Sequence, residues 1–302
     1  MKEKRIVRHL ERPSTLGGWI RRLRWTILRR IVQLGVLLLF VGTARWGWTV
    51  ADRKVLAGDL SSSEVLGLVP LSDPLALLER WFAGHAPAGA ALTGALIVFA
   101  LYAVLGSRTF CGWVCPMNLV ADAADWLRRR LGLDADVVRL SKSVRYVSLA
   151  TALAASFATG VAAFEVVSPQ AILWRDLIWG TGLSALSVAF GIFALDLALM
   201  RHGWCGHLCP LGGFWATVGK LAGRLFGRTL LTVTFDTRRC TRCGDCLRVC
   251  PEPQIIRFTK LEATGRIPTG ECLHCGKCLE ICPEDALHLG FTSKPNTTLE
   301  EK

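Results

Sequence analysis

Four apolar runs dominate the first two thirds of the chain. Each is close to the roughly twenty residues that a helix needs to cross the hydrocarbon core of a bilayer, and they lie at residues 31–50, 88–105, 146–164 and 180–200. Arg45 interrupts the first run near its end, and Asp196 lies in the last turns of the fourth. Alanine and glycine are frequent in the last three runs, which favours close helix packing in lipid. The pattern predicts a membrane domain of four helices.

The distribution of lysine and arginine predicts the orientation of these helices. Ten of these residues precede the first run, three lie between the first and second runs, and seven lie between the second and third. Because Lys and Arg are enriched in cytoplasmic loops, both termini are expected on the cytoplasmic side of a bacterial inner membrane, and residues 1–30 form a basic cytoplasmic tail. The net charge of +12 follows from this topology and from anionic lipid, so a nucleic-acid partner is not required.

The pair Arg29-Arg30 before an apolar run also has the pattern of a twin-arginine export signal. Three further apolar runs follow that pair, and a chain with several spans fits poorly with export in the folded state. The sequence therefore favours a multi-pass membrane protein.

The four runs also form two similar units. Each unit has an apolar run, an outer loop with a Pro-x-Ala-x-Leu segment, a second apolar run and an inner Cys-x-x-x-Cys-Pro motif. The two motifs lie at residues 111–116 and 205–210, and basic amphipathic stretches at 119–131 and 214–228 are expected on the membrane surface. We predict that residues 31–228 form a pseudo-symmetric, all-α four-helix bundle with both cysteine motifs at its cytoplasmic face.

The last quarter of the chain repeats one cysteine pattern. Four cysteines separated by two, two and three residues end at a proline, first at 240–251 and again at 272–283. Three cysteines at this spacing wrap a loop around a cubane [4Fe-4S] cluster, and in two-cluster ferredoxins the cysteine before the proline binds the other cluster. The predicted ligand sets are Cys240, Cys243 and Cys246 with Cys282, and Cys272, Cys275 and Cys278 with Cys250.

These sets predict a small α+β ferredoxin domain with two [4Fe-4S] clusters at residues 229–291, followed by a polar tail at 292–302. A strand is expected at 230–235, with short helices near Pro251 and Pro283. A zinc site or a disulfide framework would need neither a third cysteine in register nor a following proline. The expected chemistry is one-electron transfer.

The other four cysteines have three interpretations. Two pairs brought together by the pseudo-twofold would supply four thiolates, enough for a third cluster. A redox-active thiol pair is an alternative, and so are reduced thiols that only pack a turn. The residues concerned are Cys111, Cys115, Cys205 and Cys209.

Missing motifs limit the other cofactors. None of the six histidines lies in a predicted span, where a membrane haem would need its ligands, and the chain has no Cys-x-x-Cys-His motif for covalent haem. It also has no Gly-x-Gly-x-x-Gly segment opening a helix and no Walker loop. We therefore expect neither haem nor a nucleotide.

Together these motifs resemble those of the NapH-type ferredoxin proteins. The shared features are four spans, paired Cys-x-x-x-Cys-Pro motifs within segments such as 203–210, and a C-terminal dicluster ferredoxin; they cover residues 25–291. The resemblance implies a membrane quinol dehydrogenase subunit, not a stand-alone enzyme, which passes electrons from the quinone pool through a partner iron–sulfur subunit toward a periplasmic nitrate reductase. The MauN-type proteins of methylamine utilisation share this arrangement.

Quinol oxidation also needs a proton acceptor near the electron carrier. Asp196 is the candidate, because a carboxylate within a span is costly and usually functional; pairing with Arg201 is the alternative. Charged residues expected at the outer face are Arg45, Asp73, Glu165 and Arg175. A second hypothesis is a membrane-bound maturation or docking factor that supplies electrons for assembling a partner oxidoreductase, such as methylamine dehydrogenase.

Overall fold

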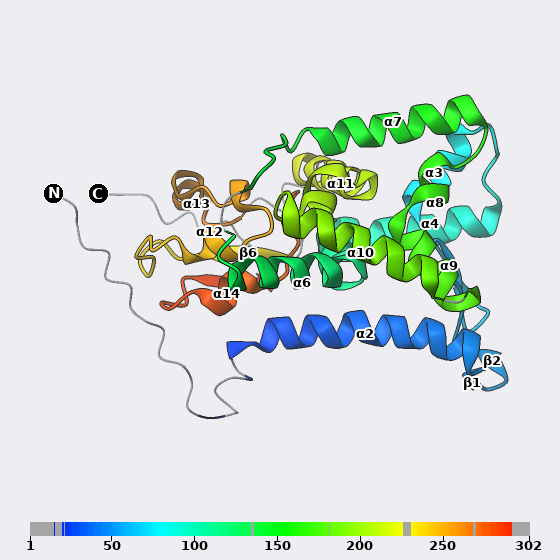
Figure 1. The fold of residues 1–302 in the computed structure, drawn as a ribbon, viewed down its shortest axis with the longest axis horizontal. Helices are drawn as coiled ribbons and strands as arrows, with labels where there is room; N and C mark the ends of the chain where they lie inside the picture. Colours follow the sequence, from blue (N-terminus) through cyan, green and yellow to red (C-terminus); the bar gives the residue numbers. More distant parts are fainter. Residues whose placement is uncertain are drawn as a thin grey trace.

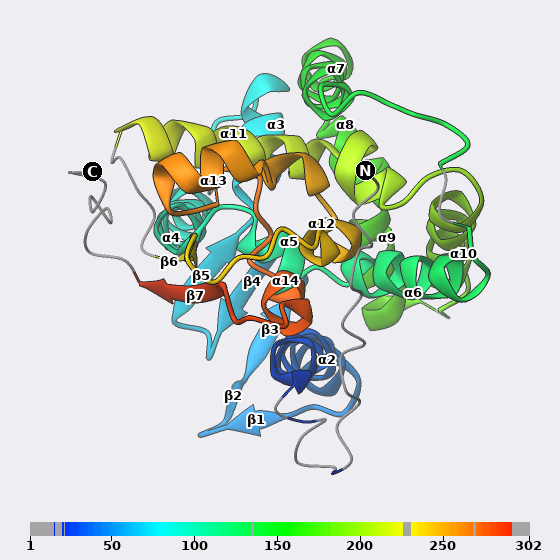
Figure 2. The same ribbon diagram turned by 90° about the vertical axis from the view of Figure 1, so that its left-hand side faces the viewer.

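The computed structural model describes residues 15, 20, 22–133, 136–180, 182–225, 231–267 and 270–291. Most of the predicted basic tail and all of the polar tail at 292–302 lie outside these residues. Figure 1 shows the helices of the N-terminal part running along the long axis, with the C-terminal elements α12, α13 and α14 gathered at one end. Seen along that axis in Figure 2, helices α2, α4, α7 and α10 are viewed end-on, whereas α11 lies crosswise.

Each predicted span overlaps one of these four end-on helices. Their bounds are Arg24–Arg45 for α2, Gly89–Leu105 for α4, Val144–Thr159 for α7 and Leu183–Ala198 for α10. Among the described residues, α2 is the one helix long and apolar enough to cross a membrane, while α4 and α10 are apolar but shorter. The predicted helical character of the N-terminal part is confirmed, whereas a bundle of four full-length spans is not shown.

Helix α2 differs from the predicted 31–50 span at both ends. It begins at Arg24, within the segment that the sequence assigned to the tail, because the side chains of Arg29 and Arg30 turn inward and bind Asp122. It ends at Arg45, since Gly47 adopts a left-handed φ of 67° that a helix cannot continue through.

The segment after α2 contains strands that the sequence did not predict. A hairpin of β1 and β2 is followed by an antiparallel meander in the order β3, β4, β5, with Ser63 opposite Leu71. The bounds are Thr49–Val50, Arg53–Lys54, Leu56–Gly58, Ser62–Val65 and Val69–Ser72. Strand β5 packs against α4, where Gly94 lies so close to the strand that a Cβ atom would be 3.0 Å from the Pro70 carbonyl.

Both halves of the helical part lead from an apolar helix through a cysteine motif into a helix with one apolar face. In the first half α4 is followed by α5 (Thr109–Trp113) and α6 (Met117–Arg130). In the second half α10 is followed by a π-helical turn, η1 (Trp204–Leu208), and α11 (Pro210–Leu225). The helices α3 (Pro74–Phe82), α8 (Ala163–Val167) and α9 (Pro169–Trp179) complete this part. Buried side chains of both halves share one core, which includes Leu75, Phe110, Leu211 and Trp215.

The C-terminal part is a small α+β unit. Strand β6 (Leu231–Phe235) pairs antiparallel with β7 (Leu287–Phe291), and the short helices are α12 (Asp245–Val249), η2 (Pro253–Ile255), α13 (Phe258–Thr264) and α14 (Lys277–Ile281). The predicted strand is confirmed. The helices expected near the two prolines lie before them, because each ends at the residue preceding a Cys-Pro pair, and a residue before proline is disfavoured in the helical region.

Candidate metal centres

The first cysteine set closes around a cavity in the C-terminal part. Cys240, Cys243, Cys246 and Cys282 all line this cavity, which has an empty volume of about 420 Å³. The Arg242 amide donates a hydrogen bond to the Cys240 sulfur at 3.4 Å, and the Ala286 amide donates one to the Cys282 sulfur at 3.3 Å. These are the four residues that the sequence grouped together. Cys243 is exposed, so this cavity lies next to solvent.

The second set has the same local backbone. Cys250, Cys272, Cys275 and Cys278 line a cavity of about 370 Å³. In both cysteine loops the fifth residue is a glycine with positive φ, Gly244 at 83° and Gly276 at 76°, and it precedes the short helix that carries the third cysteine. This left-handed turn, which suits glycine, lets three sulfurs point toward one centre. The three cysteines of the second loop are buried.

The third set brings the two Cys-x-x-x-Cys-Pro motifs together. Cys111, Cys115, Cys205 and Cys209 line one cavity of about 400 Å³, two from each half of the helical part. The turn between α8 and α9 reaches the same cavity with Ser168 and Gln170. The sequence placed that turn in an outer loop and the cysteines at the cytoplasmic face. In the structure they meet because α9 begins at Pro169, directly beside Cys115.

The residues around the three cavities fit iron–sulfur clusters. Each cavity has four cysteine sulfurs around a space of similar volume. Four thiolates are the ligand set of a [4Fe-4S] cluster. Burial raises the pKa of both Cys209 and Cys272 to about 12, so a bound cation is needed to keep these thiols ionised.

Buried polar groups support the third set. Burial raises the pKa of the Cys111 thiol, and the positive charge of the Arg108 guanidinium opposes that rise. The Cys115 thiol donates a hydrogen bond to Gln170 Oε1 at 3.6 Å. The Ser168 hydroxyl is fully buried at the cavity and has no hydrogen-bond partner among the described residues. An unpartnered buried hydroxyl costs free energy, which a bound polar group would recover.

Asp196 lies behind this third set. It is buried near the end of α10, and its Oδ1 accepts a hydrogen bond from the Trp204 amide at 3.1 Å, the residue before Cys205. Its Oδ2 has no partner among the described residues. The alternative pairing is not seen, because Arg201 binds Asp125 and Asp136 instead. Asp196 therefore positions the second cysteine motif and keeps one free oxygen.

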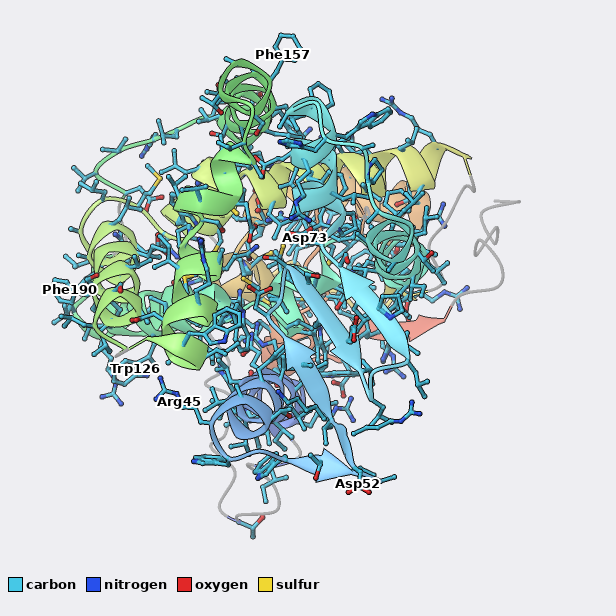
Figure 3. The ribbon with its side chains drawn as sticks, turned by 90° about the vertical axis from the view of Figure 1, so that its right-hand side faces the viewer. Arg45, Asp52, Asp73, Trp126, Phe157 and Phe190 are labelled. Atoms are coloured by element: carbon cyan, nitrogen blue, oxygen red, sulfur yellow. The ribbon has the colours of Figure 1, made fainter. Side chains whose placement is uncertain are left out.

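The charged residues expected at the outer face make local contacts, and two of them cap helices. Arg45 donates hydrogen bonds to the carbonyls of Leu177 and Gly180 at the end of α9, at 2.7 and 2.6 Å. Asp73 accepts one from the Leu75 amide and so begins α3. The remaining two also contact backbone or side chains nearby: Glu165 accepts from the Ser61 hydroxyl, and Arg175 donates to the Glu165 carbonyl. In Figure 3, Asp73 lies in the middle of the end of the molecule that faces the viewer, and Arg45 lies beside the end of α2.

Ionic contacts between the helical and C-terminal parts were not predicted from the sequence. Glu252, which follows a Cys-Pro pair, binds Arg108 at 2.6 Å, Arg145 at 3.0 Å and Lys142 at 3.0 Å, and its side chain is 1% exposed. In the sequence these three cations indicated only the orientation of the predicted membrane spans. A second contact joins Lys277 to Asp122 at 2.7 Å. The one hint in the sequence is an acidic residue next to each cysteine loop in a strongly basic chain.

The α5 motif and the second cysteine loop also touch directly. The Trp113 indole donates a hydrogen bond to the His274 carbonyl at 3.0 Å. A Cβ atom on Gly112 would lie 2.5 Å from the Leu273 carbonyl oxygen, so no larger residue fits within this Cys-Gly pair unless the loop moves. The third cavity is therefore built against the second.

Comparisons with known proteins agree with this arrangement. A 4Fe-4S binding domain model matches twice, at residues 87–134 and 181–229, and a 4Fe-4S dicluster domain model matches residues 232–283. The chain is 40% identical over 247 residues to the ferredoxin-type protein NapH of Escherichia coli, covering 81% of each chain. It is 41% identical over 249 residues to the methylamine utilization ferredoxin-type protein MauN of Methylorubrum extorquens, covering 82% of each. No solved structure matches significantly.

Domains of this kind hold iron–sulfur clusters and transfer single electrons. The repeated match over residues 87–134 and 181–229 also corresponds to the two halves of the helical part, each with its own cysteine motif. With its cysteine-lined cavities, its dicluster domain and relatives at this level of identity, the chain belongs to the family of ferredoxin-type iron–sulfur electron-transfer proteins that includes NapH and MauN.

Proposed function

We propose that this protein is a membrane-bound subunit that oxidises quinol and delivers the electrons to a partner iron–sulfur subunit, toward a periplasmic nitrate reductase. Within it, the first and second cysteine sets each hold one [4Fe-4S] cluster, and Cys111, Cys115, Cys205 and Cys209 hold a third. When bound, such clusters supply one-electron transfer. The observation that carries the proposal is the series of three four-cysteine cavities, which runs from an exposed end into the helical part.

The position of each cavity fits its proposed task. The first set lies in the C-terminal part, whose helices gather at one end of the molecule (Figure 1), and its exposed Cys243 is accessible to a partner. The second set lies at the interface, joined to α5 by Trp113 and His274. The third is enclosed between α5, η1 and the α8–α9 turn, and in the proposed function it receives the electrons of the quinol.

The exposed surface of the helical part supports a membrane location. Large apolar side chains point outward from all four of the end-on helices, including Phe157 on α7 at 75% exposure and Phe190 on α10 at 71%. Figure 3 shows these two side chains projecting from different edges of the molecule. So much apolar surface in contact with water is unusual for a soluble monomer and is typical of a surface that contacts a membrane or another protein. We propose a multi-pass inner-membrane protein with both termini in the cytoplasm, as the excess of basic residues near α2 favours.

Asp196 is the proposed proton acceptor for quinol. Quinol oxidation releases protons as well as electrons, so a base must lie near the first electron carrier. Asp196 is buried, its Oδ2 lacks a partner among the described residues, and its Oδ1 binds the residue preceding Cys205. These contacts support Asp196 as the acceptor beside the third set.

A second candidate function is a maturation or docking factor that supplies electrons for assembling a partner oxidoreductase. It is favoured by the MauN relative, whose name refers to methylamine utilization and whose identity to this chain is as high as that of NapH. Both functions use the same cysteine sets, but only the first requires turnover of quinol.

The test is to purify the protein in detergent under anaerobic conditions, add a reduced quinol, and follow the clusters by electron paramagnetic resonance. The proposal expects reduction of the clusters and about twelve iron atoms per chain, at about four per cubane. Intact clusters that stay oxidised, both alone and with co-purified partner subunits, would favour the maturation function instead.

Replacing Cys115 with serine tests the third set. Serine removes one thiolate from a buried cavity, so the iron content is expected to fall from about twelve to about eight atoms per chain, with the signals of the dicluster domain retained. Met117→Leu, which alters the lining of the same cavity without removing a sulfur ligand, is the control and should keep all the iron. About eight iron atoms per chain in wild type would exclude a third cluster, and about twelve in both proteins would exclude Cys115 as a required ligand.

A further inference from the structure

One buried guanidinium lies between the second and third cysteine sets. Arg108 is 1% exposed and precedes α5. Toward the third set, its Nη2 donates a hydrogen bond to the Cys205 carbonyl at 3.3 Å. Toward the second set, its Nη1 donates to the Glu271 carbonyl at 3.1 Å, in the peptide bond that leads into Cys272.

Arg108 is not needed to neutralise its acidic partner. Its Nη1 also binds Glu252 Oε1 at 2.6 Å, but the same carboxylate is bound by Arg145 and Lys142 as well. One buried carboxylate with three cations leaves an excess of positive charge. Glu271 offsets part of that excess, through its ion pair with Arg145. If the role of Arg108 were only to bind Glu252, the other two cations would suffice.

The excess charge has a consequence for redox chemistry. The reduction potential of an iron–sulfur site depends on net charge, on hydrogen bonds to its sulfurs and on exposure to solvent. A fixed positive charge beside a cysteine set favours the reduced form, because that form carries one more negative charge, and screening by water is small for a buried group. Arg108 is such a buried positive charge beside the third set, and its hydrogen bonds also link that set to the second.

We propose that Arg108 is a positioning residue that joins the third cysteine set to the second and raises the reduction potential of the cluster held by the third. This inference rests on the proposed function, because it requires a cluster at Cys111, Cys115, Cys205 and Cys209. Arg108 acts through charge and geometry. Its fork-shaped guanidinium reaches both sets at once, which a lysine ammonium cannot do with the same hydrogen bonds.

The test is a redox titration of the purified, cluster-loaded protein, followed by electron paramagnetic resonance. The signal lost in Cys115→Ser identifies the third cluster. In Arg108→Gln the midpoint potential of that signal is expected to fall by at least 59 mV, which is a tenfold change in the ratio of reduced to oxidised form for one electron. Lysine keeps the charge, so Arg108→Lys is expected to retain most of the wild-type potential.

Lys220→Gln is the matched control. It removes a cation from the same interface, where Lys220 binds Glu271 at 2.9 Å, but Lys220 does not line the third cavity. Its potentials should equal those of wild type. The inference is overturned if Arg108→Gln leaves the third potential unchanged or if all three potentials fall equally. Should the glutamine variant not fold, a fall of 59 mV or more in the third potential of Arg108→Lys overturns it instead. Absence of any third signal in wild type would refute the proposed third cluster instead.

Discussion

Cys246→Ala is expected to remove about four iron atoms per chain and to destabilise the whole C-terminal part. Cys246 lines the first cavity and packs against the core of that part, which includes Phe235, Leu261 and Leu287. A unit of this size buries too little apolar surface to be stable alone, so much of its folding free energy comes from the bound metal. We expect a loss of several kcal/mol and, at about 4–8 °C per kcal/mol for a small domain, a fall in Tm of about 10 °C or more.

Iron analysis and thermal unfolding of the purified protein measure both effects. Thr241→Ala provides the control, because Thr241 lines the same cavity without offering a thiolate; it should keep its iron and its Tm. The ligand assignment fails if Cys246→Ala retains as much iron as wild type.

Glu252→Gln is expected to weaken the contact between the two parts of the protein by about 3–5 kcal/mol, the range for removing one partner of a buried ion pair. Glutamine has nearly the same shape but no charge, so the cations of Arg108, Lys142 and Arg145 would face one another without their shared carboxylate. Because this carboxylate lies two residues after Cys250, we also expect slower electron exchange between the second and third sets. Limited proteolysis and thermal unfolding measure the loosening.

The pH dependence of this contribution has a defined sign. Burial raises the pKa of Glu252, but the charges of Arg108, Lys142 and Arg145 outweigh burial and hold that pKa well below its usual value of 4.5. The stabilisation is therefore complete above about pH 4.5 and is lost as the pH falls toward the pKa of the folded state. The Tm difference between wild type and Glu252→Gln should be constant from about pH 6 to pH 8 and shrink in acid.

Glu271→Gln is the control that separates the effect of losing any acidic residue at this interface from the effect of losing the buried carboxylate of Glu252. Glu271 binds Arg145 and Lys220 but is partly exposed, so solvent screens its interactions. We expect a loss of less than about 1 kcal/mol. A Glu252→Gln variant no less stable than Glu271→Gln would show that the buried network does not hold the two parts together.

The amino-acid sequence by itself determined those features that depend on short-range spacing. The intervals of two, two and three residues between cysteines, with glycines such as Gly244 and Gly276, specify loops in which three sulfurs converge, whatever surrounds them. The apolar runs likewise specified helices, because a helix forms its hydrogen bonds locally. The pairing of Cys282 with the first loop was predictable only because two-cluster ferredoxins share that rule.

The helix ends and the outer strands were less predictable. The sequence did not indicate that α2 would begin at Arg24, since that start depends on Asp122, a residue nearly a hundred positions away. The short strands β3 to β5 have a mixed pattern of buried and exposed residues, and their meander is stabilised by packing of β5 on α4. Strand formation depends on such context more than helix formation does.

Only the tertiary structure decided how the cysteine sets relate to one another. Two motifs separated by nearly a hundred residues meet at one cavity, the α8–α9 turn reaches it with Ser168, and Arg108 lies between it and the second set. In the sequence Arg108 is one of 36 basic residues, and Glu252 is one of 24 acidic ones. Their roles come from burial and from mutual distance, and both quantities depend on contacts between segments that local spacing does not encode.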